Sequence, residues 1–188
     1  MNVLEAIKNR RTIRIFKQIP VEMADILKII DAGRLAPTGA NLQPLKFKII
    51  TDENIRREMF PLIKYAGYLP DWDPCFEESP TAFIAILNDT GIKPTEKSEC
   101  DSGAAIMNMS LAACELGYGS CWLGSVNRVE IKKLLKLDEK FDITYLLALG
   151  YPDQQANYFE MKDSIKYYHD ENNNVFVPKR SLEDIIVK

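Results

Sequence analysis

The sequence predicts an α+β fold, with a central sheet that is surrounded by helices. Residues 81–87 are nearly continuous in apolar side chains, which is typical of a strand buried on both faces. Residues 102–116 are apolar almost all round a helix and therefore indicate a core helix. The remaining predicted strands and helices follow one another without a strict βαβ rhythm, which favours the α+β class.

Local signals place the first two helices. Asn2 followed by Glu5 matches an N-cap with its returning acid, so a first helix is expected from there to residue 10 or 11. Pro20 is expected to begin a second helix that ends near residue 35. Its buried face is expected to consist of residues at helical spacing: Met23, Ile26, Leu27 and Ile30.

The rest of the chain divides into short elements. Strands are expected over three further apolar stretches: 45–50, 120–123 and 143–149. Asp52 is expected to cap a third helix, and a short amphipathic helix is expected at 129–135. The segment 152–174 is polar and aromatic without a clear period, so a loop with a short helix is expected there.

The composition fits one globular domain over residues 1–188, with 46% hydrophobic and 27% charged residues. The net charge of −3 and the pI of about 5.3 argue against a whole-surface affinity for nucleic acid or an anionic membrane. A phosphate site must therefore be a local basic cluster. The apolar stretches are too short to span a bilayer, and Glu5 stands where a secretory peptide needs an apolar run. We expect a cytoplasmic protein.

The cysteines do not indicate a metal or a disulfide scaffold. The chain has 4 cysteines without a CxxC pair, and 1 histidine, His169, which we expect at the surface. A zinc site needs more ligands at closer spacing, so no metal is expected. Free thiols in a reducing compartment are the expected state.

The first candidate site is a cationic segment at the end of the first helix. It contains Arg10, Arg11, Thr12 and Arg14. Guanidinium groups and a hydroxyl that converge suit a phosphate, because Arg carries a rigid fork of donors. The alternative is that these cations only complement the dipole at the end of the helix and bind no ligand.

The second candidate site is the connection at 36–44, between the second helix and the next strand. Thr38, Asn41 and Gln43 place three hydrogen-bonding side chains in a short loop that also contains Pro37 and Gly39. This density of polar groups suits the edge of a polar ligand. The alternative is a tight turn, because Pro, Gly and Asn are common turn residues.

The third candidate site is the glycine-containing stretch 117–125. A dinucleotide fingerprint would follow a strand and open a helix, whereas these glycines follow a helix and precede a strand. A dinucleotide-binding dehydrogenase is therefore disfavoured. Gly117 is explained as a helix C-cap, and Gly124 is either a turn residue or a place where backbone approaches a flat ligand.

Five segments occur in one order along the chain: RRTIRIF, APTGANLQP, GAAIMNMSLAACELGYGSCWLG, LLALGYP and VPKRSLEDII. In this order and spacing they resemble the FMN-dependent nitroreductase family, over essentially the whole chain. The resemblance implies a nitroreductase-like α+β fold, with a central and mostly antiparallel sheet surrounded by helices. It also implies an intertwined homodimer that holds FMN at the subunit interface.

The resemblance assigns the cofactor phosphate and the edge of the flavin ring to cationic residues. The phosphate would be held by Arg10, Arg11 and Thr12 together with Lys179 and Arg180. Arg14 would lie at the pyrimidine edge of the flavin, where a cation stabilises the negative charge of the reduced ring.

The resemblance assigns the rest of the flavin site to two other segments. The loop would reach the flavin from the partner subunit, through Pro37, Thr38, Gly39 and Asn41, and Gln43 is assigned to the same site. One face of the ring would be lined by Trp122, Leu123 and Gly124.

The implied activity is that of an NAD(P)H-dependent FMN oxidoreductase. NADH or NADPH would give electrons through FMN to a small oxidant such as a nitroaromatic or a quinone, by a ping-pong mechanism that needs no protein nucleophile. Other flavin chemistry, namely reductive dehalogenation or flavin breakdown, stays open, as does a flavin store or sensor without turnover. This chain has Leu45 at a position where members of the family usually carry an aromatic residue. The segment 65–80 is compact and rich in Tyr, Trp, Asp and Pro.

Both features affect which oxidant the protein would accept, and the sequence does not identify that oxidant.

Overall fold

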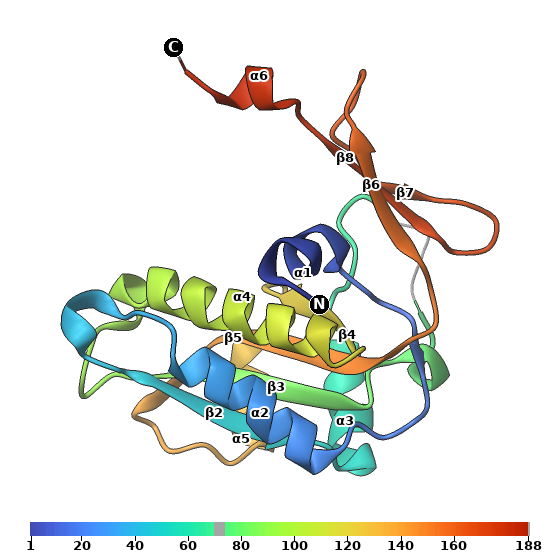
Figure 1. The fold of residues 1–188 in the computed structure, drawn as a ribbon. Helices are drawn as coiled ribbons and strands as arrows, with labels where there is room; N and C mark the ends of the chain where they lie inside the picture. Colours follow the sequence, from blue (N-terminus) through green and yellow to red (C-terminus); the bar gives the residue numbers. More distant parts are fainter. Residues whose placement is uncertain (70–73, 188) are drawn as a thin grey trace.

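A five-stranded sheet forms the centre of the molecule (Figure 1). The computed structural model describes residues 1–69 and 74–187. Strand β5 (Phe141–Pro152) pairs with β3 (Ala82–Asp89) on one side and with β1 (Phe16–Lys17) and β4 (Gly119–Leu123) on the other. Strand β2 (Leu45–Ile50) pairs with β3. These pairings are all antiparallel, which confirms the predicted α+β class and the mostly antiparallel sheet.

Helices cover both faces of this sheet (Figure 1). One face packs on α2 (Met23–Arg34) and α4 (Glu99–Glu115), and the other on α3 (Glu53–Met59) and α5 (Arg128–Leu134). Successive side chains of β3 point to opposite faces, so a continuous apolar run serves two cores at once. Within the described residues, the connections contain four short 3-10 helices: η1 (Gly39–Asn41), η2 (Phe60–Leu62), η3 (Phe76–Glu78) and η4 (Thr95–Lys97).

The predicted caps are present in the structure. Helix α1 (Val3–Asn9) begins with a capping box between Asn2 and Glu5, and Asp52 caps α3 through the amide of Ile55. Helix α1 packs on the C-terminal part of α4, where the N-terminal amine pairs with Glu115 at 3.0 Å. These signals act within one turn of the chain, so the sequence predicts them well.

The second helix differs from its prediction. It begins at Met23 with Glu22 as the N-cap, so Pro20 lies outside it. Met23 and Leu27 are about half exposed, and the buried positions are Ile26, Ile29 and Gly33. Gly33 lies so close to Met109 of α4 that a methyl group there would be 2.8 Å from its Cγ. The face of α2 that packs on α4 therefore contains Gly33, and Met23 and Leu27 lie outside the buried face.

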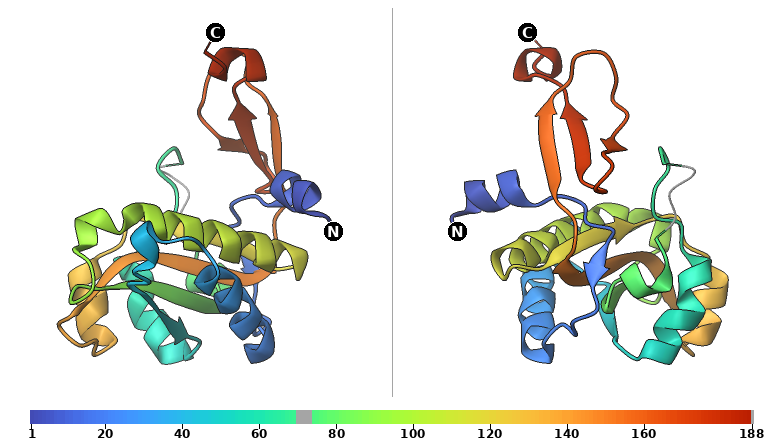
Figure 2. Two further views of the ribbon diagram at one scale, coloured as in Figure 1. Left: turned by 60° about the vertical axis from the view of Figure 1, so that its left-hand side comes forward. Right: turned by 90° about the vertical axis from the view of Figure 1, so that its right-hand side faces the viewer.

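The prediction of a loop with a short helix at 152–174 is wrong. This region contains β6 (Ala156–Glu160) and β7 (Tyr168–His169), which pair with β8 (Val175–Lys179) in a second sheet. Helix α6 (Leu182–Ile185) follows. We call residues 156–187 the C-terminal arm, and it projects from the body in all views (Figures 1 and 2). Strand β6 pairs with β8 across the intervening β7, a contact that a search for local periodicity misses.

All helices of the described chain are too short or too polar to serve as membrane spans.

Candidate functional site

The cationic segment 10–14 lies directly beside β4. Thr12 forms a parallel bridge with Ser120, and the amide of Ile13 donates to the Ser120 carbonyl at 3.0 Å. A Cβ at Gly119 would lie 2.9 Å from the Ile13 side chain, so glycine permits this approach. Two of the three candidate segments are thus brought together by backbone pairing.

Arg11 is partly buried at the end of α1. Its terminal nitrogens donate to the carbonyls of Arg10 at 2.6 Å and Lys8 at 2.5 Å, and its guanidinium lies 4.5 Å from the centre of the Tyr158 ring. Burial, and then the neighbouring Arg10, lower the pKa of Arg11. Its Nε is buried and has no hydrogen-bond partner among the described residues. Arg11 thus contacts the carbonyl end of α1, as expected if these cations only complement the helix dipole. Its Nε nevertheless remains a donor without an acceptor among the described residues.

Arg14 is held by three segments. Its Nε donates to the Tyr65 carbonyl at 2.7 Å, and its guanidinium lies 4.9 Å from the centre of the Tyr167 ring in the C-terminal arm. Its amide donates to Gln154 Oε1, which also accepts from the amide of Ile15. Arg14 is 9% exposed, and none of the ion pairs in the described chain joins its terminal nitrogens to a carboxylate. Arg14 is a fixed, unneutralised cation.

The end of β4 presents both a flat side chain and an open backbone. Trp122 is 41% exposed and meets the ring of Tyr145 edge to face at 5.2 Å, while Leu123 is buried. Gly124 is exposed, and a Cβ there would lie 3.5 Å from the Tyr145 ring. Backbone and aromatic surface are therefore accessible at the position predicted to line a flavin.

The loop at 37–43 has an unusual backbone. Ala40, Asn41 and Gln43 adopt φ values of 51°, 54° and 51°, which non-glycine residues rarely adopt. The amide of Gln43 donates to the hydroxyl of Thr38 at 3.1 Å, and the amide of Gly39 donates to Asp101 at 3.0 Å. Left-handed residues cost energy and often occur at ligand sites.

Within one chain, the structure does not assemble all predicted site residues. The loop that contains Pro37 lies at the end of the molecule remote from α1 and the C-terminal arm (Figure 1). In the described ranges, no hydrogen bond or ion pair joins this loop to segment 10–14 or to 122–124. Lys179 and Arg180 lie on the C-terminal arm, and within the described residues they form no hydrogen bond with Arg10.

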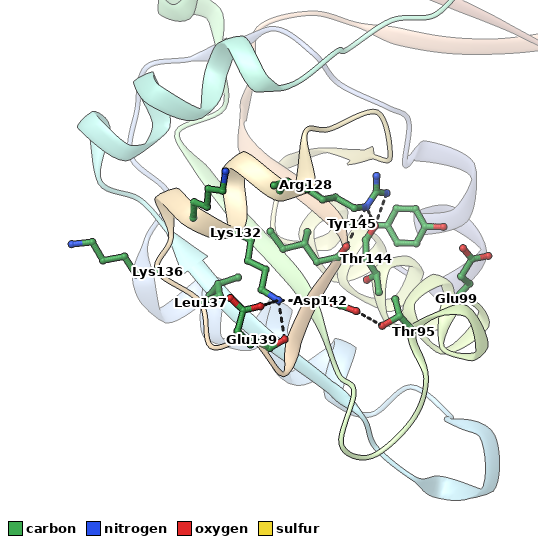
Figure 3. Close-up of a pocket in the computed structure, with 13 residues that line it drawn as sticks. Thr95, Glu99, Arg128, Lys132, Lys136, Leu137, Glu139, Asp142, Thr144 and Tyr145 are labelled. Atoms are coloured by element: carbon green, nitrogen blue, oxygen red, sulfur yellow. Dashed lines mark hydrogen bonds and ion pairs between the residues drawn. The ribbon is translucent and has the colours of Figure 1, made fainter.

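A hollow of about 770 Å³ lies between α5, the start of β5 and the start of α4 (Figure 3). Several of its charged groups pair with one another: Lys132 pairs with Glu139 and Asp142, and Asp142 accepts from Thr95. Arg128 donates to backbone carbonyls of β5. The predicted site residues do not line this hollow, and we assign it no function.

Sequence reasoning missed several residues that hold the site: Tyr65, Asp101, Gln154, Tyr158 and Tyr167. Each contacts a candidate residue from a segment that is distant in sequence, so no local pattern marks it. The nearest signal was the aromatic richness of 65–80, of which residues 70–73 lie outside the described chain.

Comparison with known proteins establishes the family. The model of the nitroreductase family matches residues 7–67 and 70–151. The chain belongs to this family. A protein of Archaeoglobus fulgidus, provisionally named NADH dehydrogenase/NAD(P)H nitroreductase, is 31% identical over 166 residues, which cover 85% of this chain and 91% of that protein. The predicted family and fold are thereby confirmed.

Two further comparisons indicate the range of related proteins. The structure resembles a provisionally assigned nitroreductase of Desulfovibrio desulfuricans solved with FMN, at a TM-score of 0.76 and 26% identity, covering 100% of this chain and 96% of that one. An iodotyrosine deiodinase of Thermotoga neapolitana is 23% identical over 180 residues, covering 86% of this chain and 95% of that protein.

The four thiols should differ sharply in reactivity. Cys75 and Cys100 are exposed, whereas burial raises the pKa of Cys121 to about 11. The thiolate is the reactive form, so Cys121 should stay unmodified by a thiol-specific disulfide reagent near pH 8 in the native protein. Denatured protein serves as the control and should titrate 4 thiols. Fast modification of Cys121 in folded protein would contradict the burial, and loss of electron transfer in a cysteine-free variant that retains FMN would indicate thiol chemistry.

Proposed function

We propose that this protein is an FMN-dependent oxidoreductase that transfers electrons from NADH or NADPH to a small oxidant such as a nitroaromatic or a quinone. FMN is its cofactor, and when bound it supplies the two-electron carrier. Family membership and the resemblance to an FMN-bound nitroreductase support this proposal. The observation that carries it is the fixed cation Arg14, on the segment that pairs with β4 through Thr12 and Ile13. The cytoplasmic location and the single domain at 1–188 stay predictions.

The donor chemistry of the site fits FMN. Arg11 has a buried Nε without a hydrogen-bond partner among the described residues, and the neighbouring Arg10 forms no ion pair within them. Such donors suit a phosphate group. Arg14 would meet the pyrimidine edge of the ring. Trp122 offers an exposed flat side chain and Gly124 an open backbone, whereas Leu123 between them is buried. The role of each residue is part of the proposal.

In the proposed reaction, NAD(P)H and the oxidant bind in turn at the same open face of the flavin site. NAD(P)H donates a hydride and leaves as NAD(P)⁺, and the oxidant then enters and takes two electrons with protons, as when a quinone becomes a hydroquinone. The chain's contribution is to hold the ring, to keep Arg14 next to it and to leave one ring face open. Arg14 stabilises the form of the ring that carries negative charge.

We propose an intertwined homodimer with one FMN site at each end of the interface. One chain places the loop at 37–43 far from segment 10–14 (Figure 1). If both segments belong to one flavin site, as proposed, the partner supplies the loop. Apolar side chains that are at least 39% exposed lie on α1, α2, α4 and the C-terminal arm: Val3, Leu4, Ile7, Met23, Leu27, Met107, Leu182, Ile185 and Ile186. An obligate interface would bury them.

The C-terminal arm also has a complementary surface on the body. A hollow of about 500 Å³ between α2 and β2 is lined by apolar residues and by the cations Arg34 and Lys46. The tip of the arm combines Leu182 and Ile185 with the acids Glu183 and Asp184. In the proposed dimer the tip of each arm occupies this hollow on the partner.

A second candidate function is reductive dehalogenation, favoured by the similarity to the iodotyrosine deiodinase. It uses the same cofactor position, so the polypeptide geometry does not separate it from nitro or quinone reduction. Flavin breakdown and flavin storage without turnover are further alternatives. A panel of nitroaromatics, quinones and halogenated phenols, each with NADH and with NADPH, separates these activities.

Purified protein should be yellow, and acid should release FMN from it, because the cationic segment suits one terminal phosphate. The bound flavin should lose its visible absorbance when NADH or NADPH is added without oxygen. Absorbance spectra and chromatography of the released pigment measure both effects. Colourless protein that cannot be reconstituted with FMN would contradict the proposal, and a stable yellow protein that no nicotinamide reduces would favour a store or sensor.

Arg14 should tune the cofactor rather than only bind it. Loss of a partly buried, charge-assisted hydrogen bond typically costs about 1.5–3 kcal/mol. For a two-electron couple this corresponds to a midpoint potential lower by roughly 30–65 mV in Arg14→Ala. A dye-coupled redox titration of FMN-loaded variants measures it. Arg14→Lys keeps the charge and should shift less, and Lys17→Ala removes an exposed cation of β1 and should not shift the potential. An unchanged potential in Arg14→Ala would refute this role.

A chain that ends at Ser181 should be monomeric and should bind FMN weakly. It lacks the apolar tip of the C-terminal arm but retains Lys179 and Arg180. Sedimentation velocity and flavin fluorescence measure assembly and binding. Val129→Ser removes an exposed apolar side chain of α5 and serves as the control, which should remain dimeric. A truncated monomer that still holds FMN tightly would refute the shared site.

A further inference from the structure

A buried ion pair lies beneath the loop at 37–43. Lys93 Nζ and Asp101 Oδ2 are 2.5 Å apart, and the two side chains are 13% and 6% exposed. The other oxygen, Asp101 Oδ1, accepts the amide hydrogen of Gly39 at 3.0 Å. One carboxylate therefore joins a core helix, a lysine and the backbone of the loop.

Both members of the pair are fixed to the core. Asp101 lies in the first turns of α4, the helix that crosses one face of the sheet. The carbonyl of Lys93 accepts a hydrogen bond at 2.8 Å from the side chain of Asn88, which is fully buried in β3. The ion pair thus fixes the position of Gly39 relative to strand β3 and helix α4.

The loop needs such an anchor. Its left-handed residues Ala40, Asn41 and Gln43 each cost on the order of 1 kcal/mol. Among the hydrogen bonds that residues 37–43 make within the described chain, only that from Gly39 to Asp101 reaches outside the loop. A Cβ at Gly39 would lie 3.1 Å from Lys93 Nζ, so the backbone approaches the ion pair as closely as glycine allows.

We propose that Asp101, held by Lys93, is a positioning residue for the flavin site of the partner subunit. It fixes Gly39, and thereby the whole loop, in the conformation that completes the site across the dimer interface. This inference rests on the proposed function, because the loop is assigned to the flavin there.

The energetics favour a positioning role over a purely stabilising one. Buried ion pairs often contribute no more to stability than apolar side chains of similar volume, because both charges lose their hydration. The carboxylate does something that an apolar residue cannot, since it accepts the amide hydrogen of Gly39. Removal of both charges should therefore spare the fold and release the loop.

The test compares three variants. Lys93→Met with Asp101→Leu removes both charges and the acceptor for Gly39, and it avoids a lone buried charge. In the same Lys93→Met background, Asp101→Asn keeps an oxygen that can accept from Gly39 and leaves no lone buried charge. Ser102→Ala is the matched control, because it removes a buried hydrogen bond from the same helix to Thr144 and does not touch the loop.

Two measurements are made on full-length protein. Amide hydrogen exchange of residues 36–44 in FMN-free dimers should accelerate in the double variant and remain slow in Ser102→Ala. FMN should bind about tenfold or more weakly to the double variant, with partial recovery in Asp101→Asn and no loss in Ser102→Ala. Unchanged exchange and unchanged FMN affinity in a folded double variant would overturn the inference.

Mixed dimers test whether the loop acts across the interface. One chain carries Arg11→Ala with Arg14→Ala, and the other carries the double variant. If the loop serves the partner, one of the two sites combines intact arginines with an intact loop, so half of the sites should regain tight FMN binding. If mixed dimers form and no site recovers, the loop does not act on the partner and the inference is wrong.

These outcomes are separate from failure of the proposed function. Wild-type protein that binds no FMN would refute the proposed function, and the exchange measurement would still test whether Asp101 anchors the loop. Wild-type protein that binds FMN as a dimer, together with a double variant that binds it equally well, would refute the positioning role alone.

Discussion

The backbone contact between segment 12–13 and Ser120 is the constraint on which the site depends. It holds a cationic stretch against the edge strand β4, and it exists because Gly119 has no side chain to keep Ile13 away. This contact also fixes the backbone positions of Arg11 and Arg14, because both residues lie within two residues of it. The aromatic end of β4 is fixed by the same pairing. The arginines and the aromatic end of β4 are therefore held in fixed positions relative to each other by the same backbone contact.

Several parts of the fold could be predicted because their signals are local. Asn2 and Glu5 cap a helix within one turn, and the unbroken apolar run of β3 can be satisfied only between two helical layers. The C-terminal arm escaped prediction because β6 pairs with β8 across an intervening strand, so its order comes from contacts distant in sequence. Pro20 was a misleading signal, because the chain stays extended for two more residues before α2 begins.

In the candidate site, too, features with a local sequence signal could be predicted, and features that depend on contacts distant in sequence could not. Arg10 to Arg14, the loop at 37–43 and the end of β4 carry residue types that indicate their chemistry, so the sequence points to them directly. Their supports do not. Tyr65 offers only a backbone carbonyl to Arg14, and Asp101 is one acid among the many of the chain until the fold brings it under Gly39. Residue type indicates what a group can bind, and tertiary packing decides what holds it.

The C-terminal arm has an evolutionary consequence in the proposed assembly. Both the tip of the arm and the hollow between α2 and β2 are encoded by the same chain, so a twofold dimer contains the contact twice. Any substitution in either surface is therefore duplicated, and its effect on the free energy of association is roughly doubled. A substitution that weakens the contact of Leu182 or Ile185 would weaken it at both places in the dimer. We therefore expect such substitutions in the arm to be accompanied in evolution by compensating substitutions in α2 or β2.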